Sequence, residues 1–267
     1  MSHLHVPDGV LPWWLVIAGW LVTAAIVGVC IRVVSADDMR RRIPLIGAVA
    51  ALMLVGMSSE IVPIAYHINL TVVGGILIGP VLAWPAALVV VTILALLGHG
   101  GVTVIGLNTL VIGAEMALGA WLFRALRRAL GPRRSGWSAA LATVATLALT
   151  TSMLVGIVAL GGAPAASRES GAFDPATLRF ENPFGKWVLG SETLNAGEPT
   201  PPAEDPAMSL TRFALMVYTL GSIGWVIEAA VTGGIISFIA GVRPSLVEAG
   251  GLAEDGHRSV GDEGSHV

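Results

Sequence analysis

Histidines are the residues of this chain best suited to bind a transition metal, and two of the six stand near its beginning. The chain opens with MSHLHVPDGVLP, which places His3 and His5 before a Pro-Asp-Gly turn and an apolar segment. Imidazole nitrogens bind nickel, cobalt, copper and zinc, and planar sets of nitrogen ligands favour nickel(II) or copper(II). This opening therefore indicates a nitrogen-rich metal site that includes His3 or His5.

A flat chelate would form from an α-amine, a deprotonated backbone amide and an imidazole of the first residues, with His67 as the fourth nitrogen donor. Such a site would select its ion by geometry rather than by charge. The alternative is that His3 and His5 are frayed terminal residues and that His67 is an ordinary interfacial histidine. His99, in the glycine-rich run GHGG, is either a further ligand or a plain loop residue.

Three carboxylates in apolar surroundings form a second set of candidates. Glu60 lies near the end of one apolar segment, and Glu115 and Glu228 lie within two later segments. Carboxylates inside membrane spans are costly and by default indicate function, although hydrogen bonding between helices is the alternative explanation. Asn108 could orient a ligand histidine or bond to another helix. The residues that could replace a ligand or orient one are Ser59, Glu60, His99 and Asn108.

The composition indicates that membrane helices must position these residues. Hydrophobic residues make up 54% of the 267 positions and charged residues 12%, about half the charged fraction of a soluble domain. Runs of about 20 apolar residues are long enough to cross a bilayer as helices. Such runs occupy 11–34, 44–63, 70–97, 103–123, 137–160 and 209–241.

The run 70–97 is interrupted by Gly79-Pro80 and again by Trp84-Pro85. We expect two short or tilted helices that meet near Pro80–Pro85. Irregular backbone at this depth is tolerated only where it is buried in protein or lines a cavity. The predicted fold class is therefore an all-α, polytopic membrane helix bundle with about seven transmembrane helices.

The distribution of basic residues predicts the orientation of this bundle. Ten of the fifteen Lys and Arg residues lie in or beside the 35–43 loop, the 124–136 loop and the end of the last helix. Basic residues concentrate in cytoplasmic loops, so we expect the N-terminus outside and the C-terminus inside. His67 and His99 then fall on the outer side, together with the N-terminal histidines.

The chain is expected to form one transmembrane domain, 1–247, with an external loop at 161–208 and a polar cytoplasmic tail at 248–267. His257 and His266 in that tail are best explained as solvated residues. The sequence has no phosphate-binding loop, zinc-protease motif or serine-hydrolase elbow, which indicates no enzymatic activity of those classes. The net charge of −3 does not indicate a nucleic-acid partner.

Three stretches of the sequence carry a family resemblance. They are HVPDGVL at 5–11; His67 followed by the blocks GGILIGP at 74–80, GHGGVT at 98–103 and GLN at 106–108; and the end of the chain from Glu228 through VRPSL at 242–246. Together they resemble the CbiM/NikM family, the cobalt and nickel substrate-binding membrane subunits of energy-coupling-factor transporters. The first two stretches are specific to the family, and the third is weak.

The resemblance implies seven helices and a metal site in which the terminal amine and the second-residue histidine are joined by a histidine of the loop after the second helix. By position, these histidines are His5 and His67. Ni2+ or Co2+ would be the transported substrate, with no permanently bound cofactor. The implied partners are a transmembrane coupling subunit, a pair of cytoplasmic ATPases that hydrolyse ATP and a small accessory membrane subunit. The implied location is the cell inner membrane.

Two other functions stay open from the sequence. A subunit of the same transporter class could capture a vitamin or another non-metal substrate, although aromatic residues, which would line such a pocket, make up only 6% of the chain. A structural or assembly role without a substrate is the third possibility. The choice between nickel and cobalt also stays open, because both accept nitrogen donors.

The N-terminus departs from the family pattern, because the family histidine directly follows the initiator methionine and His5 does not. Either Met1 is removed, so that Ser2 and His3 supply the amine and the imidazole, or translation begins at position 4. The second option gives the family opening Met-His-Val-Pro-Asp-Gly, and we favour it. The long acidic loop at 161–208 is also atypical, and its role stays open.

Overall fold

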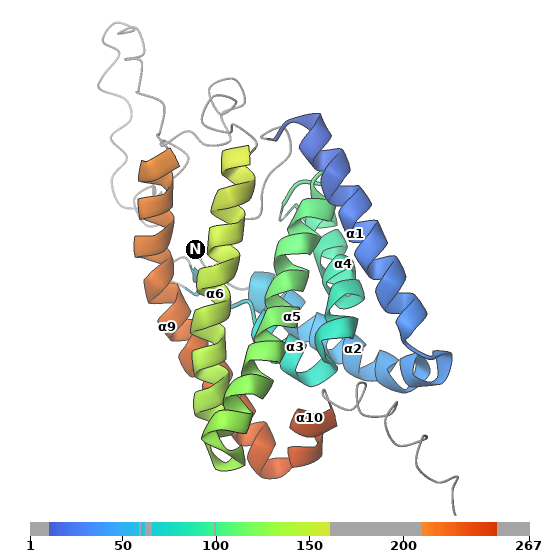
Figure 1. Cartoon of the computed structure of the whole chain (residues 1–267), viewed down its shortest axis with the longest axis vertical. Coiled ribbons are helices and arrows are strands. Elements are labelled where there is room, and N and C mark those ends of the chain that lie inside the picture. The colour runs from blue at the N-terminus through green and yellow to red at the C-terminus, as the bar shows by residue number, and fades with distance from the viewer. Residues whose placement is uncertain (1–10, 59, 62–65, 99, 161–209, 250–267) are drawn as a thin grey trace, which may run out of the picture.

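The computed structural model describes residues 11–58, 60–61, 66–98, 100–160 and 210–249. In this part of the chain, helices form a bundle and two short strands form a hairpin (Figure 1). The elements are α1 (Trp13–Val33), α2 (Ala36–Ser58), β1 (Glu60–Ile61), β2 (Tyr66–His67), α3 (Thr71–Ile78), α4 (Pro80–Leu96), α5 (Ile105–Leu130), the 3-10 turn η1 (Pro132–Arg134), α6 (Ser135–Leu160), α9 (Leu210–Val242) and α10 (Pro244–Ala249).

Helix α2 begins eight residues earlier than the apolar run predicted, and it ends at Ser58. The side chain of Ser35 caps its first turn, because the Asp38 N–H donates to the Ser35 hydroxyl over 3.2 Å. Asp37 and Asp38 in this turn also suit the positive end of the helix dipole. Capping and charge thus allow α2 to begin within the polar segment that precedes the apolar run. The helix ends five residues before the end of that run, and the β1–β2 hairpin follows it.

The predicted turn in the run 70–97 is confirmed at Gly79. This residue has φ 87° and ψ 164°, a conformation that favours glycine, and Pro80 then begins α4. The second expected break is wrong, because α4 continues through Pro85. Helix α3 has only eight residues, all buried, and is about 12 Å long. It is therefore too short to cross the hydrocarbon core of a membrane by itself.

Four stretches of the described chain are long and apolar enough to cross a membrane. They are Trp13–Val33, Ile105–Leu130, Pro132–Leu160 and Val217–Val242. Helix α4 is apolar but shorter. The described part of the chain is therefore an all-α membrane bundle apart from its short hairpin. The number of seven spans and the orientation stay predictions.

Close backbone contacts at glycines hold the long helices together. The most extensive pairing is between α6 and α9, where Gly136 and Gly233 face each other. A Cβ atom on Gly233 would lie 2.9 Å from the Gly136 carbonyl oxygen. Helix α1 crosses α5 in the same way, because a Cβ atom on Gly106 would lie 2.7 Å from the Trp20 nitrogen. The residues at these contacts must stay small for the helices to approach so closely.

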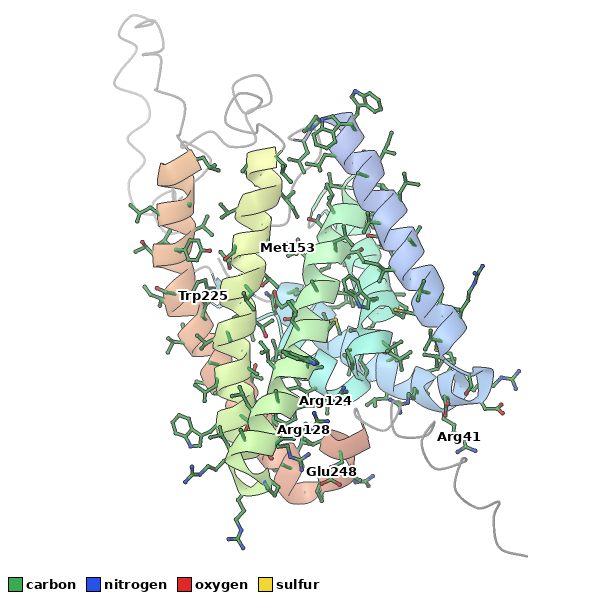
Figure 2. All side chains as sticks on the ribbon, in the orientation of Figure 1. Arg41, Arg124, Arg128, Met153, Trp225 and Glu248 are labelled. Atoms are coloured by element: carbon green, nitrogen blue, oxygen red, sulfur yellow. The ribbon has the colours of Figure 1, made fainter. Side chains whose placement is uncertain are left out.

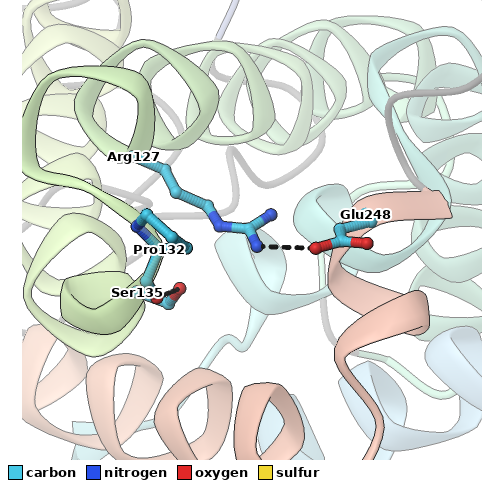
Figure 3. Close-up of polar contacts among 4 residues, drawn as sticks. All are labelled: Arg127, Pro132, Ser135 and Glu248. Carbon is cyan, nitrogen blue, oxygen red and sulfur yellow. Dashed lines mark hydrogen bonds and ion pairs between the residues drawn. The ribbon is translucent and has the colours of Figure 1, made fainter.

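One end of the bundle carries most of the charged side chains. Arg41, Arg124, Arg128 and Glu248 all lie toward this end in Figure 2. Helix α10 packs here against α9 and α3, and the Arg127 guanidinium lies 3.1 Å from the Glu248 carboxylate (Figure 3). The connection from α5 to α6 is tightened by the Ser135 hydroxyl, which donates to the Pro132 carbonyl over 2.7 Å.

Candidate functional site

The β1–β2 hairpin places the backbone of Glu60 directly opposite that of His67. These two residues are Cα partners in the antiparallel pair, next to the pair of Ile61 and Tyr66. Two candidates that are seven positions apart in the sequence are thus neighbours at the end of α2. The side chains of Glu60 and His67, and all of His3, His5, Ser59 and His99, lie outside the described residues.

The segment 68–71, which follows His67, is held by two buried carboxylates. The Asn69 N–H donates to Glu228 Oε1 of α9 over 2.7 Å. Two residues later, the Thr71 hydroxyl donates to Glu115 Oε1 of α5. The structure therefore brings two of the predicted acids to the chain segment that carries His67.

Glu115 and Glu228 both lie in the interior of the bundle, with 0% and 2% of their surface exposed. A second hydroxyl, from Thr150 of α6, donates to Glu115 Oε2 over 3.2 Å. Burying a carboxyl group is costly unless hydrogen bonds compensate for lost water. Hydroxyl donors provide that compensation for both oxygens of Glu115, and the Asn69 N–H provides it for Oε1 of Glu228.

Leu70, between the two anchored residues, has a left-handed backbone. Its φ of 55° and ψ of 17° make it the only non-glycine residue with positive φ in the described part of the chain. This conformation costs an L-residue about 1–2 kcal/mol. Backbone strain of this kind persists only where the surrounding structure determines the conformation in several ways. The two hydrogen bonds on either side of Leu70 do so here.

The last turn of α2 packs tightly on the same segment. A Cβ atom on Gly56 would lie 2.4 Å from the Ile68 carbonyl oxygen, so a larger residue does not fit without a backbone shift. Segment 68–71 is therefore confined by α2, α5 and α9 together.

This segment lies deep in the bundle rather than at its surface. Glu115 is ten residues, or about 15 Å, from the start of α5, and Glu228 is eighteen residues, or about 27 Å, from the start of α9. The connection from α2 to α3 enters the bundle because α2 ends at Ser58, before the end of the apolar run, and because α3 reaches the Gly79 turn in only eight residues. Residues 69–71 are accordingly buried, and the expected position of His67 on the outer side of the membrane stays a prediction.

Asn108, a predicted orienting residue, is buried on α5 with 4% of its surface exposed. It lies seven residues before Glu115 and so shares the same face of the helix. Helix α1 is bound to this part of α5, because the Thr23 hydroxyl donates to the Gly106 carbonyl over 2.7 Å. The indole N–H of Trp20 likewise donates to the Thr103 carbonyl over 2.8 Å.

The start of α1 is anchored at the same end of the bundle. Leu11 and Leu15 form an apolar cluster with residues at the start of α5 and the end of α6, including Val104 and Leu154. The described chain therefore begins close to the start of α5. The predicted approach of His5 to His67 lies outside the described residues.

Three residues of this site were not predicted from the sequence, namely Asn69, Thr71 and Thr150. Thr71 and Thr150 are polar residues within apolar runs, Asn69 directly precedes such a run, and each of the three is at least nine-tenths buried. The Nδ2 atom of Asn69 has no hydrogen-bond partner among the described residues. Polar residues at such positions were a usable signal, but only the fold shows which carboxylate each of them meets.

No three His, Cys, Asp or Glu side chains gather closely enough to hold a metal ion in the part of the chain that the structure describes. The predicted nitrogen ligands are not among the side chains described. The structure does show that the backbone directly after one of these ligands, His67, is confined in segment 68–71.

Comparison with known proteins gives three findings. The model of a protein family, the cobalt uptake substrate-specific transmembrane region (CbiM), matches residues 5–246. A protein of Haloquadratum walsbyi, named as a candidate metal transport protein, is 29% identical over 252 residues, covering 91% of this chain and 93% of the relative. The crystal structure of a truncated transition metal transporter has a similar fold, with a TM-score of 0.62 and 15% identity over 90% of this chain and 99% of that one.

Proposed function

The chain belongs to the CbiM family of cobalt uptake substrate-specific transmembrane regions, and on that basis we propose that it captures Ni2+ or Co2+ for uptake. The family match over 5–246 is the observation that carries this proposal. A transporter component of this kind is not itself an enzyme. The confined segment 68–71 supports the proposal, because selection by geometry needs a ligand on a fixed backbone.

The proposed site is a plane of nitrogen donors around the ion. The α-amine of the mature chain, the following backbone amide and the imidazole of His5 provide three donors, and the imidazole of His67 provides the fourth. Such a set favours ions that accept planar coordination, with nickel ahead of cobalt in intrinsic affinity. If Met1 is removed and Ser2 becomes the first residue, His3 replaces His5 in this set.

The proposed assembly is an energy-coupling-factor transporter in the cell inner membrane. Seven helices cross the membrane, with the N-terminus outside and the C-terminus inside. A transmembrane coupling subunit, a pair of cytoplasmic ATPases and a small accessory membrane subunit complete the transporter. The absence of a phosphate-binding loop from the sequence supports an external source of energy.

Metal titration of the purified protein tests the site. We expect one equivalent of Ni2+ to give a yellow, diamagnetic complex, as square-planar nickel does, and Co2+ to compete for the same site. His67→Ala and His5→Ala should abolish uptake and leave only weak residual binding, while membrane insertion stays intact. His266→Ala, in the C-terminal tail, is the control and should behave as wild type. Wild-type uptake by the His67→Ala protein would remove His67 from the ligand set.

N-terminal sequencing of the native protein identifies the residue that supplies the amine. A chain that begins with methionine at position 4 places His5 second, as the chelate requires. A chain that begins at Met1 with position 4 internal would exclude His5 from such a chelate.

A further inference from the structure

We propose that Glu228 and Glu115 are positioning residues of the metal site, which fix the backbone after His67 and thereby the direction of its imidazole. This inference rests on the proposed function, because it assumes that His67 is a metal ligand. Neither carboxylate is placed in contact with the ion. Each acts through segment 68–71.

The first observation is that the segment is anchored at two points by two different helices. Glu228 of α9 accepts the Asn69 N–H over 2.7 Å, and Glu115 of α5 accepts the Thr71 hydroxyl. Asn69 is only two residues beyond His67. A shift of either helix or of either carboxyl group would therefore move the backbone that carries the ligand.

The second observation is that the backbone between the two anchors is strained. Leu70 has a φ of 55°, and α2 approaches the segment so closely that a Cβ atom on Gly56 would lie 2.4 Å from the Ile68 carbonyl oxygen. Without its anchors, this segment would relax toward a right-handed conformation. Its geometry is thus maintained by the tertiary contacts.

The partner of Glu228 separates this role from simple helix-to-helix bonding. A carboxylate that only joins helices would bond to a side chain or backbone of another helix. Glu228 accepts a backbone N–H in the connection between β2 and α3, a contact that the joining of helices does not require. Glu115 does both, because it also accepts the Thr150 hydroxyl of α6 over 3.2 Å. Glu228 is the more direct test, because it binds the backbone of the segment, whereas Glu115 binds a side chain of it.

We expect a loss of metal affinity in variants of these residues, because a planar site tolerates little change in the direction of a ligand imidazole. Groups that orient a metal ligand from behind are usually worth about 10–100-fold in metal affinity. We expect Glu228→Leu, which removes the acceptor at similar volume, to weaken Ni2+ binding by about this factor. Glu228→Gln keeps an amide oxygen that can accept the Asn69 N–H, so its loss should be several times smaller.

A second pair of variants tests the other anchor independently. Thr71→Val removes the hydroxyl donor with little change in shape, and Thr71→Ser restores it. We expect the valine variant to lose affinity and the serine variant to recover most of it. Glu248→Gln, which changes an exposed carboxylate at the end of α10, is the matched control and should bind Ni2+ as wild type does.

All variants are measured as full chains in detergent, by absorption titration with Ni2+ and by thermal melting without metal. Support for the inference is a loss of affinity in Glu228→Leu or Thr71→Val together with a melting temperature near that of the wild type. In a His67→Ala background, the same substitutions should cause no further loss of residual binding, because their effect passes through His67.

Wild-type affinity and absorption in both Glu228→Leu and Thr71→Val would overturn the inference. An equal loss with and without His67 would also overturn it, because the carboxylates would then act on the fold in general. Failure of the wild-type protein to bind either ion, or full binding by His67→Ala alone, would instead show that the proposed function or its ligand set is wrong.

Discussion

The two buried carboxyl groups, those of Glu115 and Glu228, have different hydrogen-bond partners, and these partners indicate what each group does. Glu115 contacts hydroxyl groups of α3 and α6, whereas Glu228 contacts a backbone amide beside the hairpin. In the sequence, both are single acids in apolar runs and look the same. In the proposed metal site, both act through segment 68–71, to which they are hydrogen-bonded.

At Gly75, the close packing of α3 on α5 leaves no room for a side chain. A Cβ atom at this position of α3 would lie 2.0 Å from the Met116 carbonyl oxygen of α5. Because the obstacle is backbone, the helices themselves would have to separate. We expect Gly75→Ala to destabilise the protein by about 3 kcal/mol, at the upper end of the usual cost of overpacking. Thermal melting in detergent measures this loss.

Gly28 is the matched control for this substitution. It lies within α1, and a Cβ atom there would meet nothing within 4 Å. Gly28→Ala should stabilise the protein slightly, by about 0.5–1 kcal/mol, because glycine is the less favourable residue inside a helix. Equal effects at the two positions would show that the α3–α5 contact is looser than described.

At the scale of elements, the short α3 explains why the site lies inside the bundle. Eight buried residues bring the chain from Thr71 to the Gly79 turn, and the longer α4 returns it toward the other end. In Figure 1, α3 occupies only the half of the bundle nearer to α10. Segment 68–71, which directly precedes α3, therefore lies inside the bundle, where Glu115 and Glu228 reach it.

Helix α10 closes the bundle below α3, and its apolar side chain should matter more than its ion pair. Val247 is buried in the main core, whereas Glu248 is 59% exposed in its pair with Arg127. We expect Val247→Asp to cost about 2 kcal/mol or more, because it buries a polar group. Glu248→Gln should cost less than about 1 kcal/mol, as exposed ion pairs usually do.

Thermal melting of the two α10 variants at low and moderate salt measures both effects. Salt should have little influence on the Val247→Asp loss, because that loss comes from burial. A larger loss for Glu248→Gln than for Val247→Asp would show that the ion pair is what docks α10.

At the scale of the whole molecule, the two ends of the bundle differ in charge. The basic side chains gather where α5 ends and α10 packs, as Figure 2 shows for Arg124 and Arg128. The start of α1 and the start of α5 lie at the opposite end (Figure 1). The rule that basic loops stay in the cytoplasm then predicts one orientation for the entire bundle.

Cysteine labelling tests this orientation, since Cys30 is the only cysteine and is buried. In a Cys30→Ala background, we expect Val102→Cys to react with a membrane-impermeant maleimide in intact cells. Arg133→Cys should react only after lysis. Both positions are exposed and lie at opposite ends of α5. The reverse pattern, or labelling of both from outside, would refute the predicted orientation.

Much of the fold could be predicted because its signals are local. Apolar runs indicated the long helices, and Gly79-Pro80 indicated the turn between α3 and α4. The predicted start of α2 was late because its first turns are polar, and the prediction of a break at Pro85 was wrong. The family resemblance in the sequence is confirmed over 5–246.

The candidate site was only partly predictable. His67, Glu60 and the two intramembrane acids could be selected because histidine and buried carboxylates are chemically distinctive. Asn69 and Thr71 could not be assigned a role, because their function depends on partners far away in the sequence. The predicted ligands His3 and His5 stay predictions, as do Ser59 and His99.

The sequence by itself determined that this protein lies in a membrane, that the chain turns at Gly79-Pro80, and which residues could bind a metal. These properties depend on composition and on neighbours within a few positions. Only the tertiary structure decided that Glu228 meets Asn69, 159 positions away, and that Leu70 is left-handed between two anchors. The physical reason is that a buried donor and acceptor find each other through the packing of helices, which no local pattern of residues specifies.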